Sequence, residues 1–470
     1  MPSWFSSGSS SASAAVTALQ QRLRAAERRL LDTYAPRFAA GGRSNDGSTT
    51  TSWQAVDTLI ARHVVPLPKH VDLAGSNNNN NKDGTYTMHS IRVVTSTTTD
   101  DNDKKDNANN KSTTPLVLLH GYMNGGAYFY RNVMTLSRYF SAVHAVDLLG
   151  WGLSSRPQWP TSSKTSLTCA TAEDVLVESL EAWRAAQPNL ERMILTGHSM
   201  GGYTAVAYAE RYPERVEQLV LLSPVGVPAD SAERRAQQEE QMKQARASWR
   251  FRALIYTWQT LFAWNVTAGQ VLRSLPTQRA QHYVEGYLQA RIPALRDVPD
   301  ERQAVADYLY LNSALPGSGE YWVSACLHAN LMAKQPLMER IPKLRGISNV
   351  TFLYGSHDWM DPVTGGLATQ QACANNQEKG APHVTVQMVQ DAGHLLLLDN
   401  PHAVNAAIIA ASSEPGTKFA RQHLFQGLQS IRTLQVPRLP TAMEEEEEQQ
   451  QRQRQEALTT VSLSTEPGSS

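Results

Sequence analysis

The sequence has few cysteines, few charged residues and no long apolar run, and each shortage excludes a class of protein. Its 470 residues include three cysteines, Cys169, Cys326 and Cys373. These are too few and too scattered for a disulfide framework or a cysteine-rich zinc site, so we expect three reduced thiols. No stretch approaches the roughly 18 apolar residues that cross a bilayer. Any membrane contact is therefore expected to be peripheral.

The charge balance excludes nucleic acid as a partner. Lys and Arg number 43, as do Asp and Glu, and the formal net charge is zero. That removes the basic footprint on which nucleic-acid binding depends. Charged residues make up only 18% and aromatic residues only 7% of the chain. Ser, Thr, Asn and Gln are correspondingly frequent. They gather in tracts that we expect to be disordered, at 41–51, 76–83, 95–114 and in an acidic, glutamine-rich tail over 433–470.

The first 50 residues predict an amphipathic helix followed by a polar linker. An apolar stripe at helical spacing consists of Val16, Leu19, Leu23, Ala26 and Leu30. Two interpretations stay open. The helix lies on anionic lipid with Trp4 and Phe5 as an anchor, or it packs against the rest of the protein. The segment lacks the apolar core of a secretory signal and is Arg-containing and free of acids before Glu27. We expect a cytoplasmic protein, associated peripherally with a membrane or lipid droplet, with mitochondrial import as the alternative.

In the segment 85–410, strand patterns and helix patterns alternate as they do in an α/β protein. Residues 86–94 alternate like an early antiparallel strand. Continuous apolar runs then recur at 116–119, 143–146, 193–195, 219–222, 350–353 and 384–389. Helical patterns separate them at 126–140, 171–186, 200–212 and 401–411. Such runs indicate a mostly parallel central sheet with helices on both faces.

One long segment interrupts this alternation of strands and helices. Residues 229–345 hold only helical periodicities and lie between two strand–helix units, so we interpret them as an inserted helical cap. The core then consists of two parts, 51–228 and 346–432.

The sequence Gly197-His198-Ser199-Met200-Gly201 follows a predicted strand and opens a predicted helix. G-x-S-x-G in that setting is a nucleophile elbow. Glycine is needed at 197 and 201 because side chains there would collide with the neighbouring strand and helix. We therefore predict Ser199 as a nucleophile at a helix N-terminus, where developing negative charge is favoured.

A serine nucleophile needs a base and an orienting acid. In proteins with this elbow the order is Ser, acid, His, each in a loop after a later strand. His394 follows the apolar run 384–389 and is the predicted base. Asp358 follows the run 350–353 and is the favoured acid, with Asp361 as the alternative.

Two further features belong to the same loops. Backbone N–H groups of Met200 and of Tyr122, in a glycine-rich loop after the run 116–119, are the predicted oxyanion donors. His394 and Asp399 also form an H-x4-D motif, the spacing used by glycerolipid acyltransferases. Asp399 could equally cap the helix that begins near Pro401.

Several longer segments resemble one subfamily of abhydrolase-domain proteins. The subfamily contains a lipid-droplet lipase co-activator, an N-acylphospholipid lipase, a fungal cardiolipin-specific deacylase and a plant phospholipase/acyltransferase. The matching segments are PLVLLHGY (115–122), AVDLLGWGLSSRP (145–157), TGHSMGGYTAVAYAERYPERVEQLVLLSPVGVP (196–228), YLYLNSALPGSGEYW (308–322), FLYGSHDWMD (352–361) and AGHLLLLDNPH (392–402).

The resemblance implies an α/β-hydrolase fold with a helical cap and acylated glycerophospholipids or lysophospholipids as substrates. It favours an active serine hydrolase, because the lipase co-activator has Asn where this chain has Ser199. Lysophosphatidic acid acyltransferase activity from acyl-CoA through the H-x4-D motif is one alternative. A non-catalytic co-activator at a lipid surface is another. No metal or organic cofactor is implied.

Overall fold

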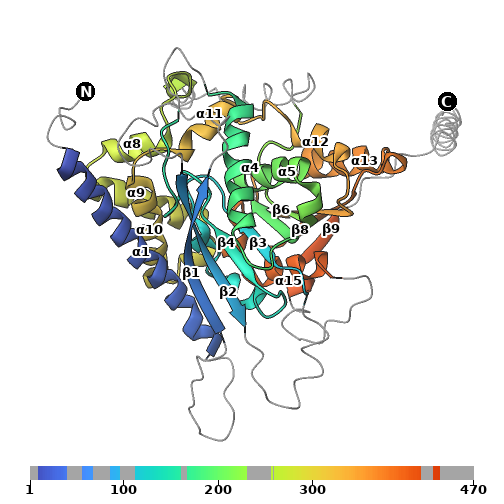
Figure 1. Ribbon diagram of the computed structural model, residues 1–470, viewed down its shortest axis with the longest axis horizontal. Helices are drawn as coiled ribbons and strands as arrows, with labels where there is room; N and C mark the ends of the chain where they lie inside the picture. Colours follow the sequence, from blue (N-terminus) through green and yellow to red (C-terminus); the bar gives the residue numbers. More distant parts are fainter. Residues whose placement is uncertain are drawn as a thin grey trace, which may run out of the picture. The chain divides into compact units, whose positions relative to one another are not determined.

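Six apolar runs of the sequence form neighbouring parallel strands in a computed structural model of the chain (Figure 1). These strands are β3 (Leu116–Leu119), β4 (Val143–Val146), β5 (Met193–His198), β6 (Val216–Leu222), β7 (Asn349–Gly355) and β8 (His383–Val389). In the part of the chain that the structure describes, the sheet has nine strands in the order β1-β2-β4-β3-β5-β6-β7-β8-β9. The predicted mostly parallel sheet is confirmed.

Antiparallel strands close both edges of the sheet. β2 (Thr85–Thr95) pairs with β4, β1 (Val56–Pro66) pairs with β2, and β9 (Ile431–Leu434) pairs with β8. β2 agrees with the predicted early strand. β1 and β9 were not predicted, because polar residues break the alternation of β1 and β9 has only four residues.

The structure describes part of the chain. The described residues are 9–39, 56–66, 85–95, 112–159, 167–229, 256–257, 259–413 and 427–434, with the backbone alone for 9–12, 34–39, 56–66 and 85. The predicted tracts at 41–51 and 76–83, residues 96–111 of the third tract, nearly all of the tail, and Trp4 and Phe5 lie outside the described residues.

Helices cover both faces of the sheet. On one face lie α4 (Cys169–Ala185) and α5 (Met200–Arg211), and α5 packs against β3, β5 and β6. On the other face lie α3 (Val133–Leu136) and α15 (Pro401–Ala411). The pleat of β3 divides its residues between the two cores. Leu116 and Leu118 join the apolar cluster beneath α3 and α15, so Val117 and Leu119, which are equally buried, face α5.

Between β6 and β7, the described residues fold mainly as helices. These are α8 (Ala268–Ser274), α9 (Thr277–Arg291), α10 (Pro299–Ala314), α11 (Trp322–Cys326) and α12 (Leu337–Arg340). We keep the word cap for these helices. Two more helices follow β7 and β8, α13 (Ala368–Ala374) and α14 (Leu396–Asp399).

Helix α1 (Ser9–Ala39) packs along α10 of the cap (Figure 1). Its stripe residues Leu23, Ala26 and Leu30 are buried in the same apolar cluster as α10. The Glu27 carboxylate is also buried and lies 3.0 Å from Nε2 of His89 on β2. Of the two interpretations of this helix, packing against the protein is therefore the one that the structure shows. Within the described residues, no helix has the length and apolar character needed to span a bilayer.

Candidate active site

Ser199 lies in a sharp turn between β5 and α5, as the elbow motif predicts. Its backbone has φ 53° and ψ −115°, a conformation that costs energy for a residue with a side chain. The turn is possible because Gly197 and Gly201 have no side chains. A Cβ on Gly197 would come within 2.2 Å of the carbonyl oxygen of Gly201, and a Cβ on Gly201 within 2.3 Å of that of Leu119. The steric reason for both glycines is thus confirmed.

The structure brings the predicted nucleophile, base and favoured acid together. Nε2 of His394 lies 3.2 Å from Oγ of Ser199, and Nδ1 lies 3.1 Å from Oδ1 of Asp358. The three residues follow β5, β7 and β8, whose carboxyl ends meet at one edge of the parallel sheet. The hydroxyl, imidazole and carboxylate therefore form one continuous hydrogen-bonded chain.

Asp358 is held as a carboxylate. Its side chain is buried, and burial raises its pKa. Hydrogen bonds from His394 and from the N–H of Met360 outweigh that effect, and the pKa lies below its ordinary value. The alternative acid Asp361 points into the next turn instead, where its Oδ1 accepts from the N–H of Val363 and its Oδ2 from the hydroxyl of Thr364.

His198, the residue before Ser199, makes a contact that the sequence did not reveal. Its Nε2 lies 2.9 Å from the carbonyl oxygen of His394. Burial lowers the pKa of His198 to about 3, so the ring is neutral and Nε2 carries the proton that it donates to the carbonyl. The turn that carries Ser199 thus also holds the backbone of His394. The only sequence signal for this contact was the presence of a histidine as the second residue of G-x-S-x-G.

The predicted oxyanion donors, Met200 and Tyr122, line the same pocket as Ser199. Met200 is the first residue of α5, so its N–H has no partner within the helix. Tyr122 lines the same pocket. Buried Asp147 holds this glycine-rich loop, because its Oδ1 accepts from the N–H of Gly126 at 2.6 Å and its Oδ2 from the N–H of Leu153 at 2.7 Å. No sequence pattern indicated a role for Asp147.

Asp399 does not contact the imidazole of His394. Its Oδ2 accepts from the N–H of Gly393 at 3.0 Å, and burial raises its pKa. The helix that begins at Pro401 is capped by Asn400 rather than by Asp399, because the Asn400 side chain accepts from the N–H of Ala403. Asp399 therefore fixes the turn before His394, a role that neither sequence interpretation predicted.

A pocket of about 820 Å³ opens over Ser199, large enough for an acyl chain. The core contributes Met200 and Val225, and the segment between β6 and β7 contributes most of the other walls, including Phe262, Trp322 and Leu327. Arg291, at the end of α9, is the one Lys or Arg side chain in the lining, and it forms no hydrogen bond or ion pair with any other described residue.

Among the described residues, two clusters outside this pocket have side chains that could hold a metal ion. Glu27, His89 and Asp147 form the first, in which a Glu27 carboxylate oxygen lies 3.0 Å from Nε2 of His89 and Asp147 accepts backbone N–H groups. Cys169, Glu173 and Cys326 form the second. All three cysteines are free thiols, as expected, but the fold brings Cys169 and Cys326 together although they are 157 positions apart.

Comparison with known proteins places the chain in a family. Residues 114–401 match the profile of the alpha/beta hydrolase fold family. The chain therefore belongs to the α/β-hydrolase family, and the predicted fold class is confirmed.

The curated relatives agree with the subfamily recognised from the motifs. A 1-acylglycerol-3-phosphate O-acyltransferase of Arabidopsis thaliana is 31% identical over 303 residues, which are 63% of this chain and 66% of that protein. A (lyso)-N-acylphosphatidylethanolamine lipase of Mus musculus is 31% identical over 304 residues, 63% of this chain and 79% of the lipase. The chain thus spans just under two thirds of the length of the plant relative. Among solved structures, carboxylesterase CesB of Bacillus subtilis matches with 17% identity and a TM-score of 0.44 over 83% of this chain and 97% of that one.

Proposed function

We propose that this protein is a serine hydrolase that deacylates phospholipids or lysophospholipids through an acyl-enzyme. The observation that carries the proposal is the hydrogen-bonded chain from Ser199 through His394 to Asp358. An alcohol, an imidazole and a buried carboxylate in this order are the groups needed to activate a serine and to stabilise the imidazolium that forms.

The reaction follows from the geometry. Oγ of Ser199 attacks the ester carbonyl carbon while Nε2 of His394 takes the hydroxyl proton. The tetrahedral oxyanion is bound by the N–H groups of Met200 and Tyr122. His394 then returns the proton to the departing alcohol, which leaves an acyl-serine. Water deprotonated by His394 attacks that ester, and the fatty acid leaves as Ser199 regains its proton.

Two observations support a phosphorylated lipid as the substrate. The mouse relative is named for N-acylphosphatidylethanolamine and the plant relative for 1-acylglycerol-3-phosphate, and both compounds join acyl chains to a phosphate. The pocket offers an apolar wall for the chain and, for the phosphate, the guanidinium of Arg291, which has no partner among the described residues.

Acyl transfer is the second candidate, favoured by the names of the plant relatives. An acyl-serine formed from acyl-CoA can be attacked by the hydroxyl of a lysophospholipid instead of water. His394 would serve both outcomes as the same base. The position of Asp399 supports this route over a separate His–Asp pair, because Asp399 binds the backbone of Gly393 and not the imidazole.

We also infer a peripheral association with a cytoplasmic lipid surface. Most of the large apolar side chains that are exposed in the described part of the chain lie between β6 and β7: Tyr256, Trp264, Val271, Tyr283 and Tyr287. Tyr287 also lines the pocket. Aromatic side chains are favoured at membrane–water interfaces. Replacing Trp264 and Tyr283 by Ser is expected to weaken flotation with phosphatidylcholine vesicles while hydrolysis of a soluble short-chain ester persists. Unchanged flotation would contradict this inference.

The central experiment compares Ser199→Ala with Ser356→Ala. Ser356 serves as the control because its hydroxyl binds His357, outside the proposed chain of groups. Ser199→Ala is expected to lower ester hydrolysis by about 10⁴-fold or more and to prevent labelling by a fluorophosphonate. Ser356→Ala should keep both. Full activity in folded Ser199→Ala protein would refute the proposal.

A product analysis separates the two candidates. Lysophosphatidic acid, N-acylphosphatidylethanolamine and monoacylglycerol are each supplied with and without acyl-CoA. Free fatty acid as the product supports hydrolysis, and phosphatidic acid formed only with acyl-CoA supports transfer. If the protein releases neither product from any of these lipids but is still labelled by a fluorophosphonate, phospholipids are not its substrates. The protein would then be a serine hydrolase of another ester.

A further inference from the structure

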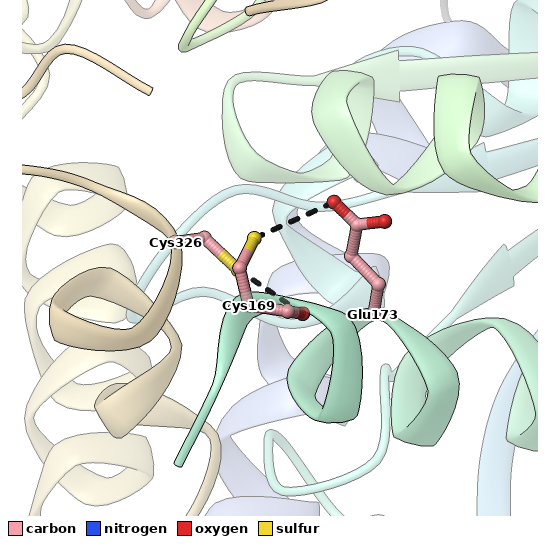
Figure 2. Close-up of side chains that lie close together, drawn as sticks. All are labelled: Cys169, Glu173 and Cys326. Carbon is pink, nitrogen blue, oxygen red and sulfur yellow. Dashed lines mark hydrogen bonds between the residues drawn. The ribbon is translucent and has the colours of Figure 1, made fainter. Parts of the chain in front are cut away.

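Three metal-ligating side chains meet where the cap contacts α4, away from the pocket over Ser199. Cys169 is the first residue of α4, Glu173 lies one turn later on the same helix, and Cys326 ends α11. Figure 2 shows the thiol of Cys169 pointing toward the Glu173 carboxylate, with Cys326 approaching from the cap. One ligand atom from each residue lies within 4.8 Å of the other two.

The distances fit a small tetrahedral ion. Zn²⁺ binds thiolate sulfur at about 2.3 Å and carboxylate oxygen at about 2.0–2.2 Å, which places two such ligands about 3.5 Å apart across a tetrahedral edge. Sγ of Cys169 lies 3.5 Å from Oε1 of Glu173. Sγ of Cys326 lies 3.7 Å from the carbonyl oxygen of Cys169, and it lies within 4.8 Å of Sγ of Cys169 and of a carboxylate oxygen of Glu173.

The surroundings of Glu173 are those of a ligating carboxylate. Arg340 donates to both of its oxygens, at 2.8 and 3.1 Å, and the hydroxyl of Tyr203 donates to Oε1 at 2.7 Å. Carboxylates that bind metals are commonly held by such outer partners. Both thiols are buried, with 7% of Cys169 and none of Cys326 exposed. The site is therefore fixed and shielded before any ion arrives.

We propose that Cys169, Cys326 and Glu173 bind one Zn²⁺ ion. Two thiolates with a carboxylate suit zinc better than calcium or magnesium, which prefer oxygen ligands only. Each thiol releases its proton to solvent as the ion binds. Water supplies the fourth ligand, since the phenol of Tyr203 remains the hydrogen-bond donor to Glu173.

The ion would join the cap to the core. The ligands come from α4 on one side and α11 on the other, and α11 also carries Trp322, Val323 and Ser324, which line the pocket. The ring of Trp322 packs against that of Tyr203 at 5.1 Å between centroids. A bound ion thus fixes one wall of the pocket without taking part in the chemistry at Ser199.

The experiment uses the full chain, first treated with a chelator under reducing conditions and then titrated with Zn²⁺ or Co²⁺. We expect one Zn²⁺ per chain by elemental analysis, a thiolate-to-cobalt charge-transfer band, and a higher Tm with Zn²⁺. Cys169→Ser and Cys326→Ser should each lose the band and the thermal shift. Cys373→Ser is the matched control, because Cys373 is also a buried free thiol but lies on α13, outside the cluster. It should keep both signals.

Two results would overturn the proposal. One is a chain that binds no Zn²⁺ beyond the level of the Cys169→Ser variant. The other is a chain that binds no metal but loses two of its three thiols, and the mass of two hydrogens, under mild oxidation, which would make this pair a redox site instead. Glu173→Gln keeps the assay decisive if a serine variant fails to fold, since it should weaken the cobalt band while both thiols stay intact. None of these readouts depends on hydrolysis.

Discussion

The imidazole of His198 is hydrogen-bonded through Nε2 to the backbone carbonyl of His394, at 2.9 Å. The residue beside the proposed nucleophile therefore holds the backbone of the proposed base, 196 positions later in the chain. The distance between Ser199 and His394 depends on this contact as well as on the two loops.

Replacing His198 tests this positioning role. His198→Ala should lower kcat by about 10–100-fold, because small misplacements of reacting groups are costly. His198→Gln should recover much of the loss, since its amide can still donate to the carbonyl. Burial lowers the pKa of His198 to about 3, so neither variant should change the pH profile of kcat above pH 4. A changed profile would show that His198 titrates in the reaction.

Asp358 and Asp361 provide a matched pair, because both lie in the loop after β7 and only Asp358 contacts His394. Asp358→Asn should lower kcat by about 10⁴-fold, since the amide favours the wrong imidazole tautomer. Asp361→Asn should stay within several-fold of the native protein. Steady-state kinetics on one soluble ester compares them, and equal losses would contradict the assignment of Asp358.

The lowered pKa of Asp358 also predicts an acid dependence of stability. A carboxyl whose pKa is lower in the folded state contributes stability above its unfolded value of about 3.9, and this contribution is lost as pH falls through the folded value. Asp358→Asn should therefore flatten the fall in the free energy of unfolding below about pH 4. Urea denaturation at several pH values measures it, and an unchanged slope would argue against a lowered pKa.

Arg291 should recognise the phosphate of the substrate. Arg291→Gln is expected to raise KM about tenfold or more for a lysophospholipid, because a charge-assisted hydrogen bond is lost. KM for monoacylglycerol should not change. Arg279→Gln is the control, since Arg279 is exposed on the same helix but does not line the pocket. Equal effects on KM for both lipids would mean that Arg291 shapes the pocket wall and does not bind the phosphate.

Two variants of Asp399 distinguish a role in positioning the backbone at Gly393 from an effect of its charge on His394. Asp399→Asn keeps an oxygen that can accept from the N–H of Gly393, and hydrolysis should stay within a few-fold. Asp399→Ala removes the acceptor and should lower kcat about 10–100-fold. Both variants are measured for hydrolysis and for acyl transfer from acyl-CoA. Loss of transfer alone in Asp399→Asn would show that the charge, not the hydrogen bond, serves the acyltransferase route.

The sequence predicted the central sheet and the three main site residues because both depend on short-range patterns. Continuous apolar runs mark parallel strands, and the loops after β5, β7 and β8 carry Ser199, Asp358 and His394. The roles of His198 and Asp147 could not be predicted, since each depends on a contact with a loop whose path the sequence does not reveal. The same holds for Cys169 and Cys326, and for the unpredicted strand β1.

The packing of α1 has a consequence for synthesis on the ribosome. Leu23 and Leu30 are buried in a cluster that α10 completes, and Arg29 pairs with Asp307 on α10, 278 positions later. At about 5–20 residues per second, translation leaves this stripe uncovered for roughly 15–55 s. During that interval the nascent chain exposes an apolar stripe that the finished protein buries, so chaperones and membranes compete for this stripe only until α10 has been made.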